Sequence, residues 1–466
     1  MRNLKYTLTA ATMLTAIPAY AAPITFASFT PIASSVPGGS LPEDQPFLLS
    51  SPSFIQETIH ANGPVGSSSR YGDNWDMNTL NENGPEAGRY LFTPYETSVN
   101  AGVRRFDLTT NSAIDLVSPG AQGFVVGDAS RWTPFGTYLT AEESWGPGST
   151  KGRLFEVTNP LGNPGSEGFT ERNIIPRVSH EGLAFDSDNN LYFIDEFNGG
   201  SIYKYVSSTP NDGATFFSAG ETFVLKVGAG GNTDALGAAT WEKITNADGS
   251  AVSADPSATV IIDGQSRVDG RIAADLAGGT NFNRPEDLEI KTVAGQQVLY
   301  FAATASGFEG AGAVFSIALN SASSAEVKLF ADRNTLKKNT AVAVGAEFLN
   351  PDNLAIDGLG NIYIIEDQPG GFADIWFAYD IDFDGIAESL GRWATLSTLG
   401  AEPTGLYFDP FDNRVAYINV QHAASDMDRT IRISINIVPE PVSVSLLAAG
   451  LGLVTGFART RGKKKA

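Results

Sequence analysis

Short apolar runs separated by turns rich in Gly, Asn and Asp recur along the middle of the chain. Residues 183–194 contain two such runs around a turn at 187–190, and residues 354–365 contain two more around a turn at 358–361. Runs of β-branched and aromatic residues joined by tight turns predict antiparallel strands. The chain therefore contains a repeated strand-turn-strand unit.

The unit recurs less regularly elsewhere, and several copies continue through a Gly-rich loop into a third strand. The further copies cover residues 88–107, 136–157, 284–302 and 402–419. The third strands are predicted at residues 200–205, 312–317 and 374–379. This order is typical of a propeller blade. We predict an all-β fold, a six-bladed β-propeller with loop insertions, the main one falling between about Gly213 and Gly279; a β-sandwich is the alternative.

Acidic residues occupy equivalent places in these units. The same number of residues separates Glu181 from Asp195 and Asp352 from Glu366, and Glu286 takes the place of Glu181 in a looser copy. Equal acid spacing is harder to explain in a sandwich. In a propeller, equivalent positions of successive blades converge at one mouth of the central channel.

Converging carboxylates repel one another at low dielectric unless a cation lies between them. We therefore predict a multi-metal site with oxygen ligands at the channel mouth. The alternative is that each acid caps a turn or pairs with a basic residue at the rim. The candidate ligands are Glu142, Glu143, Glu181, Asp195, Glu286, Asp352 and Glu366.

Composition narrows the choice of metal and partner. The formal net charge is −21, with basic residues concentrated only at the extreme C-terminus, so binding to nucleic acid is not expected. The chain has no cysteine and three histidines, His60, His180 and His422. A metal site must then be built mainly from oxygen ligands, which favours hard cations such as Ca²⁺.

A second acidic motif starts like a calcium-binding loop. Asp380, Asp382 and Asp384 precede Gly385 in the order D-x-D-x-D-G. The position that carries a bidentate Glu in an EF-hand is Gly391 here. A structural Ca²⁺ and a solvated acidic turn both remain open for this loop.

Three further residues are candidates for catalysis. His180 and His422 each lie beside a predicted strand, and each is either a ligand, a general acid or base, or a histidine with a satisfied hydrogen bond. Arg284 lies two residues before Glu286, where it either neutralises the acids or clamps an anionic substrate such as phosphate. Motifs of triad hydrolases, P-loop proteins and zincins are absent from the sequence.

Both ends of the chain read as targeting segments. Arg2 and Lys5 precede a short apolar stretch and the small residues Ala19 and Ala21, so residues 1–21 are predicted to be a secretory signal. At the other end, residues 438–466 contain Val-Pro-Glu-Pro, an apolar span and a basic tail, an order that resembles the PEP-CTERM sorting signal. That resemblance implies export through the inner membrane, processing by an exosortase, and a place at the cell surface or outside the cell. Residues 22–437 are left for the propeller.

Five motifs, in order, resemble the PhoX-type alkaline phosphatases. They are T-P-F-G-T-Y-L-T-A-E-E at 133–143, H-E-G-L-A at 180–184, R-P-E-D at 284–287, N-P-D-N-L at 350–354 followed by E-D at 366–367, and N-V-Q-H at 419–422. The resemblance covers about residues 88–435. It implies a secreted six-bladed propeller that hydrolyses small phosphate esters with a calcium and iron cluster, and we expect a monomer.

The resemblance also implies roles for individual residues. Glu181 and Glu286 would be iron or calcium ligands and Arg284 would hold phosphate oxygens. Calcium ligands would come from Glu142 or Glu143, Asp352 and Glu366. Where the family pattern implies a cysteine ligand to iron, this chain has Ala141. A calcium-dominated phosphatase, a propeller with another hydrolytic substrate such as a lactone, and a non-catalytic calcium-binding surface protein therefore all remain open.

Overall fold

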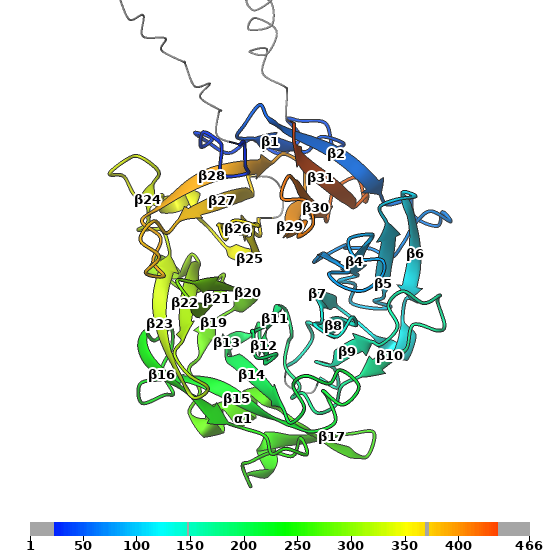
Figure 1. Ribbon diagram of the computed structural model, residues 1–466, viewed down its shortest axis with the longest axis vertical. Coiled ribbons are helices and arrows are strands. Elements are labelled where there is room, and N and C mark those ends of the chain that lie inside the picture. Colours follow the sequence, from blue (N-terminus) through cyan, green and yellow to red (C-terminus); the bar gives the residue numbers. More distant parts are fainter. Residues whose placement is uncertain (1–22, 147–148, 369–371, 437–466) are drawn as a thin grey trace, which may run out of the picture.

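The computed structural model describes residues 23–146, 149–368 and 372–436. Within them the fold is built almost wholly of strands (Figure 1). The helices in this part of the chain are α1 (Gly270–Ala277) and the short 3-10 helices η1 (Ala121–Gly123), η2 (Pro256–Ala258), η3 (Phe308–Gly310) and η4 (Gly345–Glu347). The predicted all-β class is confirmed.

Antiparallel sheets are arranged around a common centre, as in a propeller (Figure 1). One sheet contains β3 (Thr79–Leu80), β4 (Tyr90–Pro94), β5 (Val103–Asp107) and β6 (Ser112–Val117). The next contains β7 (Gly127–Trp132), β8 (Tyr138–Glu142), β9 (Leu154–Val157) and β10 (Phe169–Glu171). Each sheet is a meander, in which strands that follow one another in the chain pair with one another. The propeller-like arrangement expected from the repeats is thus present.

A nine-stranded sheet follows, and it joins two meanders. The first consists of β11 (Leu183–Phe185), β12 (Leu191–Ile194), β14 (Ile202–Ser207) and β15 (Gly220–Val227). The second consists of β20 (Pro285–Val293), β21 (Gln296–Ala303), β22 (Ala313–Leu319) and β23 (Ser324–Ala331). Strand β16 (Gly237–Lys243) pairs with both β15 and β23 and so connects them. Because of this connection, a count of sheets does not itself give six blades.

Two sheets complete the ring. One contains β25 (Pro351–Ile356), β26 (Ile362–Glu366), β27 (Asp374–Tyr379), β28 (Ser389–Leu396), β1 (Phe47–Leu49) and β24 (Leu336–Lys337). The other contains β29 (Glu402–Phe408), β30 (Val415–Gln421), β31 (Arg429–Ile435) and β2 (Phe54–Ala61). The pairing of β2 with β31, with Phe54 opposite Ile435, closes the ring between the two ends of the described chain.

Aromatic side chains fill the space between adjacent sheets. Trp393 of β28 is fully buried, and its ring lies 5.9 Å from Phe26 and 5.7 Å from Phe54. The Trp393 indole N–H also donates to the backbone oxygen of Phe26 at 3.1 Å. Burying each such side chain contributes about 2 kcal/mol, so these contacts hold the N-terminal segment against the last two sheets.

The structure adds a strand ahead of the copy predicted at residues 136–157. The first strand of this copy, β8, is second in its sheet, and β7 lies nearer the centre (Figure 1). The sequence of β7 is polar because this strand lines the centre, so it carries no apolar run to reveal it. The insertion near 213–279 contains β15, β16, the hairpin of β17 (Thr259–Ile262) and β18 (Gln265–Val268), and α1. A short pair, β13 (Asn198–Gly200) with β19 (Phe282–Asn283), lies beside it.

The predicted targeting segments lie mostly or wholly outside the described residues. Those residues exclude 1–22 and 437–466, where the secretory and sorting signals are expected. Within the described part of the chain, no helix has the length and apolar character needed to cross a membrane.

Candidate metal centre

The site is built where the first strand of each meander begins and its partner strand ends. In the pairs β3–β4, β7–β8, β11–β12, β20–β21, β25–β26 and β29–β30, antiparallel pairing brings these two points together at one end of the sheet. The acids at or just before the first strands are Asp76, Asp128, Glu181, Glu286, Asp352 and Glu402. The residues just after the partner strands are Glu96, Glu143, Glu196, Thr304, Asp367 and His422.

Glu181, Glu286 and Asp352 form the centre of this ring. One carboxylate oxygen from each lies within 4.8 Å of the others, which is close enough for all three to hold one metal ion. The Oε2 atoms of Glu181 and Glu286 are buried and accept no hydrogen bond from the described residues. Buried carboxylate oxygens without a donor are costly unless a cation compensates them, so this observation fits a hard metal ion.

Electrostatics agree with this interpretation. Burial, reinforced by the charge of Glu196, raises the pKa of Glu286 to about 8. Burial and the charge of Glu286 likewise raise the pKa of Glu181 well above its usual range. Burial and the neighbouring Glu402 raise the pKa of Asp367 to about 9. Without a cation these acids therefore resist ionisation, and a bound cation would reverse that preference.

Arg284 lies at the rim of the same ring. Its Nη2 atom is 2.6 Å from Glu196 Oε1, its Nε atom is 3.3 Å from Glu286 Oε1, and its side chain is 43% exposed. The backbone of Arg284 has φ of 51°, a left-handed conformation that a non-glycine residue rarely adopts. Such conformations persist where the surroundings hold them, and here the result is a guanidinium fixed beside the carboxylates.

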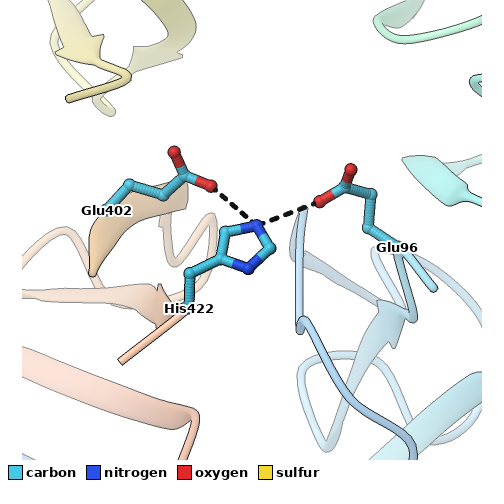
Figure 2. Close-up of side chains that lie close together, drawn as sticks. All are labelled: Glu96, Glu402 and His422. Atoms are coloured by element: carbon cyan, nitrogen blue, oxygen red, sulfur yellow. Dashed lines mark ion pairs between the residues drawn. The ribbon is translucent and has the colours of Figure 1, made fainter. Parts of the chain in front are cut away.

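A second cluster consists of Glu96, Glu402 and His422. Figure 2 shows the His422 ring between the two carboxylates, with Nε2 at 3.1 Å from Glu402 Oε1 and 3.6 Å from Glu96 Oε2. These contacts raise the pKa of His422 to about 11. Burial opposes ionisation of Glu402, but the hydrogen bonds from His422, Asp367 and Gln421 together outweigh it and lower the pKa of Glu402 to about 2. The cluster is therefore an ion triad, and its three ligand atoms are also close enough to hold a metal ion in place of the proton.

A family model described as "Alkaline phosphatase PhoX" matches residues 111–424, about two thirds of the chain. The chain belongs to the PhoX family of alkaline phosphatases. No curated protein matches the sequence.

Solved structures give weaker likenesses. A glucose dehydrogenase is 10% identical, with 81% of this chain and 98% of that chain covered and a TM-score of 0.39. An auxiliary nutrient binding protein from Bacteroides thetaiotaomicron is 10% identical, with 82% and 76% covered and a TM-score of 0.32. A polysaccharide lyase described as an ulvan lyase is 9% identical, with 77% and 94% covered and a TM-score of 0.33. At these scores the likenesses carry no argument about function.

Four of the expected ligands lie outside the two clusters of this PhoX-family site, and three of these four, Glu142, Asp195 and Glu366, have other partners. Glu142 is fully buried and paired with Arg153, with 2.5 Å between Oε1 and Nη2. Asp195 is paired with Arg271 at 2.6 Å. Glu366 accepts hydrogen bonds from the backbone N–H of Leu349 and the indole N–H of Trp376, both at 2.9 Å. All three carboxylates therefore already have partners, in or beside their own sheet or on α1.

The next residue in each case is the one that joins the ring. Glu143, Glu196 and Asp367 follow directly after Glu142, Asp195 and Glu366. Successive side chains of a strand point to opposite faces, so in an acid pair at the end of a strand only one can face the centre. Burial and the charge of Glu196 raise the pKa of Glu143 well above its usual range, which places Glu143 among the ring acids.

The histidines take different roles. Both ring nitrogens of His180 are buried and have no hydrogen-bond partner among the described residues, and the ring packs on Phe193 at 5.3 Å. Burial and the nearby Arg177 lower the pKa of His180 to about 3, so the imidazole is neutral. His180 also lies outside both clusters. His60 stacks on Trp75 at 4.9 Å and belongs to the packing between sheets.

The D-x-D-x-D-G loop brings its acids together. Oxygen atoms of Asp380, Asp382 and Asp384 lie within 4.8 Å of one another, and Gly385 has φ of 84° at the turn. Glu388 closes the loop by accepting from the backbone N–H of Ile381 at 2.8 Å. Asp382 and Asp384 are exposed, so the loop suits a solvated turn as well as a cation.

Ala141 marks the departure from the family pattern. It is fully buried on β8 and packs in an apolar cluster with Leu139 and Leu154. A methyl group cannot ligate a metal, and the chain contains no cysteine. The donors present are carboxylate oxygens and the imidazole of His422, a set that fits calcium better than a thiolate-bound iron.

The sequence analysis missed several members of the ring, including Asp76, Glu96, Asp128 and Glu402. Asp128 lies on the polar strand β7, and Asp76 lies before β3, which has only two residues. Neither strand shows the apolar run that marks the regular copies. Glu402 opens the copy at 402–419 and Glu196 lies two residues after the unit at 183–194, so the rule that equivalent positions converge could have selected both.

Proposed function

We propose that this PhoX-family chain is an exported, calcium-dependent phosphomonoester hydrolase. Family membership supports the reaction class, and the carboxylate ring supports the metal dependence. One observation carries most weight: the unpaired buried oxygens of Glu181 and Glu286, which converge with Asp352 beside a fixed guanidinium. This arrangement suits a cation that in turn binds an anionic substrate.

The carboxylates would bind the metal, and Arg284 would bind the substrate. Glu181, Glu286 and Asp352 would hold cations, which when bound neutralise negative charge on the phosphoryl oxygens and activate the attacking oxygen. Arg284 uses Nε and Nη2 for Glu196 and Glu286, and its other N–H groups remain for phosphate oxygens. Glu196 is thus a positioning residue for Arg284.

A second candidate function is a non-catalytic calcium-binding protein of the cell surface. Ala141 favours this alternative because the thiolate position implied by the family resemblance is occupied by an apolar core residue. In this case the same carboxylates bind calcium and stabilise the ring without turnover. Iron is not needed by either candidate.

The proposal extends to architecture and location. Counting the nine-stranded sheet as two blades gives a six-bladed propeller, and residues 22–437 would form this single domain. The segments at 1–21 and 438–466 would direct export and surface sorting, with an exosortase as the processing partner. The chain would act as a monomer on small phosphate esters.

The test is hydrolysis of an aryl phosphate by the purified protein after chelation and after return of Ca²⁺. We expect activity only with Ca²⁺, and loss of at least about 100-fold in Glu286→Gln and Arg284→Gln, since charge stabilisation by one such group contributes about 3 kcal/mol. Glu221→Gln is the matched control and should keep full activity, because Glu221 is a half-buried acid whose one ion pair among the described residues is with Lys243.

Metal analysis of the exported protein separates the candidates. Calcium with turnover supports the hydrolase, and calcium with added stability but no turnover supports the binding protein. Full activity in both Glu286→Gln and Arg284→Gln would remove the assignment of this site. A lactone assay run in parallel identifies a calcium-dependent lactonase.

A further inference from the structure

A cavity of about 290 Å³ lies on the outer side of the second sheet, away from the carboxylate ring. It is enclosed by the segment before β9, the end of β10 and the β17–β18 hairpin of the insertion. Its lining carries more basic than acidic side chains, although the whole chain has a net charge of −21. The charged residues of the lining are Lys151, Arg153, Glu171, Arg177, Asp263 and Arg267.

Two of the arginines are fixed by carboxylates. Arg153 pairs with Glu142 at 2.5 Å, and its side chain is only 10% exposed. Arg177 pairs with Glu171, also at 2.5 Å, and its side chain is 4% exposed. Because buried or half-buried carboxylates hold these guanidiniums, the two arginines are fixed in the cavity wall, and the excess positive charge of the lining comes from the other two cations.

The other two cations have no carboxylate partner within the described residues. Arg267 donates from Nη1 only to the backbone oxygen of Ser266 at 3.3 Å, and its Nε atom is buried without any hydrogen-bond partner. Lys151 donates to the backbone oxygen of Gly123 at 2.6 Å. A buried guanidinium donor without an acceptor is costly, so the cavity lacks a negative group that would satisfy it.

The guanidiniums are also close enough to repel one another. Burial is the main cause that lowers the pKa of Arg177; Glu171 and Glu142 oppose this effect, and the positive charges of Arg153 and Arg267 add to it. Asp263 lies at the exposed turn of the hairpin and Glu171 is already taken by Arg177. Like charges that converge around an open space favour an anion in that space.

We propose that this cavity is a binding site for a small oxyanion, phosphate or sulfate. The anion would accept from the free N–H groups of Arg267 and from Lys151, with Arg153 and Arg177 fixed in the cavity wall. Guanidinium N–H pairs match two oxygens of a tetrahedral oxyanion. The site is separate from Arg284 and the carboxylate ring, and it does not depend on the proposed hydrolase activity.

The experiment is isothermal titration of sodium sulfate into the purified full-length protein at constant ionic strength in chloride. We expect saturable binding in the wild type and in Arg284→Gln. Arg267→Gln should weaken sulfate binding about tenfold or more, since a hydrogen bond to a charged group contributes that much. Repeating the titration with phosphate in the Arg284→Gln background distinguishes the two anions without interference from the metal centre.

Several controls keep the result interpretable. Arg267 makes no ion pair in the described part of the chain, so in chloride alone the melting temperature of Arg267→Gln should be no lower than that of the wild type. Lys151→Gln should weaken binding in the same direction, and Asp263→Asn should strengthen it by removing a nearby negative charge. Absence of saturable binding, or equal affinity in Arg267→Gln and wild type, overturns the proposal. Loss of binding in Arg284→Gln alone would assign the anion to the metal centre and also overturn it.

Discussion

The carboxylate of Asp287 on β20 accepts a hydrogen bond from the backbone N–H of Leu354 on β25, with 3.0 Å between Oδ2 and N. Its other oxygen accepts from the backbone N–H of Leu288 at 2.7 Å. Asp287 is 1% exposed and follows Glu286 of the metal centre directly. The side chain therefore ties two neighbouring meanders together immediately behind the candidate ligands.

Asp287→Ala should destabilise the fold by about 1–3 kcal/mol, because the buried N–H of Leu354 loses its acceptor. Asp287→Asn keeps an acceptor oxygen and should cost less. Urea denaturation of both variants, with calcium present throughout, measures the difference. Equal stability of the alanine and asparagine variants would contradict a role for this hydrogen bond.

Glu286→Gln should have opposite effects with and without calcium. Burial and the charge of Glu196 raise the pKa of Glu286 to about 8, above the ordinary carboxyl value. A raised carboxyl pKa means that stability present at low pH is lost as the pH rises through the folded value. At pH 7 in chelator the neutral glutamine avoids this loss, and it should raise the free energy of unfolding by about 2 kcal/mol.

Calcium should then stabilise the wild type more than Glu286→Gln, since stabilisation by a ligand grows with its affinity. Melting temperatures measured in chelator and in a series of calcium concentrations test both expectations: Glu286→Gln should be more stable than the wild type in chelator and should gain less stability from calcium. Glu221→Gln should follow the wild type in both conditions. If Glu286→Gln were less stable than the wild type in chelator, repulsion and burial of the ring carboxylates would not be lowering the stability of the calcium-free protein.

Glu142 and Glu143 are adjacent, but substitution of the first should lower stability and substitution of the second should weaken calcium binding. Glu142→Gln weakens the buried pair with Arg153 and should cost stability, up to about 3–5 kcal/mol, while calcium affinity is retained. Glu143→Gln removes a ring acid and should weaken calcium binding with little loss of stability in chelator. Calcium titration and denaturation of the two variants test whether only the second acid of the pair faces the metal centre.

His60 should contribute to acid sensitivity. Burial and the charge of Arg104 lower the pKa of His60 from the usual 6.5 to about 3. Between these two values His60 is protonated in the unfolded chain and neutral in the folded chain. Stability is therefore full above about pH 6.5 and falls as the pH decreases towards 3. Between pH 6 and 4 the wild type should lose about 1.4 kcal/mol per pH unit more than His60→Gln.

The comparison of the two proteins removes the contribution of the carboxylates, which is the same in both. Glutamine can still accept the hydrogen bond that Arg104 directs at His60 Nδ1 over 2.8 Å. Denaturation at several pH values, at one fixed calcium concentration, gives the two slopes. Parallel slopes would mean that His60 protonates equally in the folded and unfolded chains.

The convergence of Glu181, Glu286 and Asp352 was predictable because three motifs placed an acid at the same point of a repeated unit. Which acid of each adjacent pair faces the ring was not predictable. A shift of one residue at a strand end turns a side chain from the centre to the interior, and apolar patterns locate strand ends only to within a few residues. For this reason Asp195 and Glu366 were selected in place of Glu196 and Asp367, and the sequence left the choice between Glu142 and Glu143 open.

Strands that line the centre were harder to find than those in the core. The sequence of β7 is Gly-Asp-Ala-Ser-Arg-Trp, and its polar residues lie at the edge of the sheet next to the central channel. The pairing of β15 and β23 through β16 was also hidden, because pairing between distant strands leaves no local pattern. Sequence periodicity thus located the strands with apolar runs and missed strands that carry part of the candidate site.

The closure of the ring by β2 and β31 also has a consequence for the order of folding. The last sheet needs residues from both ends of the described chain, so it cannot form until almost all of the chain has been made. A chain that stops before Arg429 would leave β2 and β30 without the partner they share, exposing two strand edges that can pair with other molecules. The final strand is therefore a safeguard against aggregation as well as the closing element of the ring.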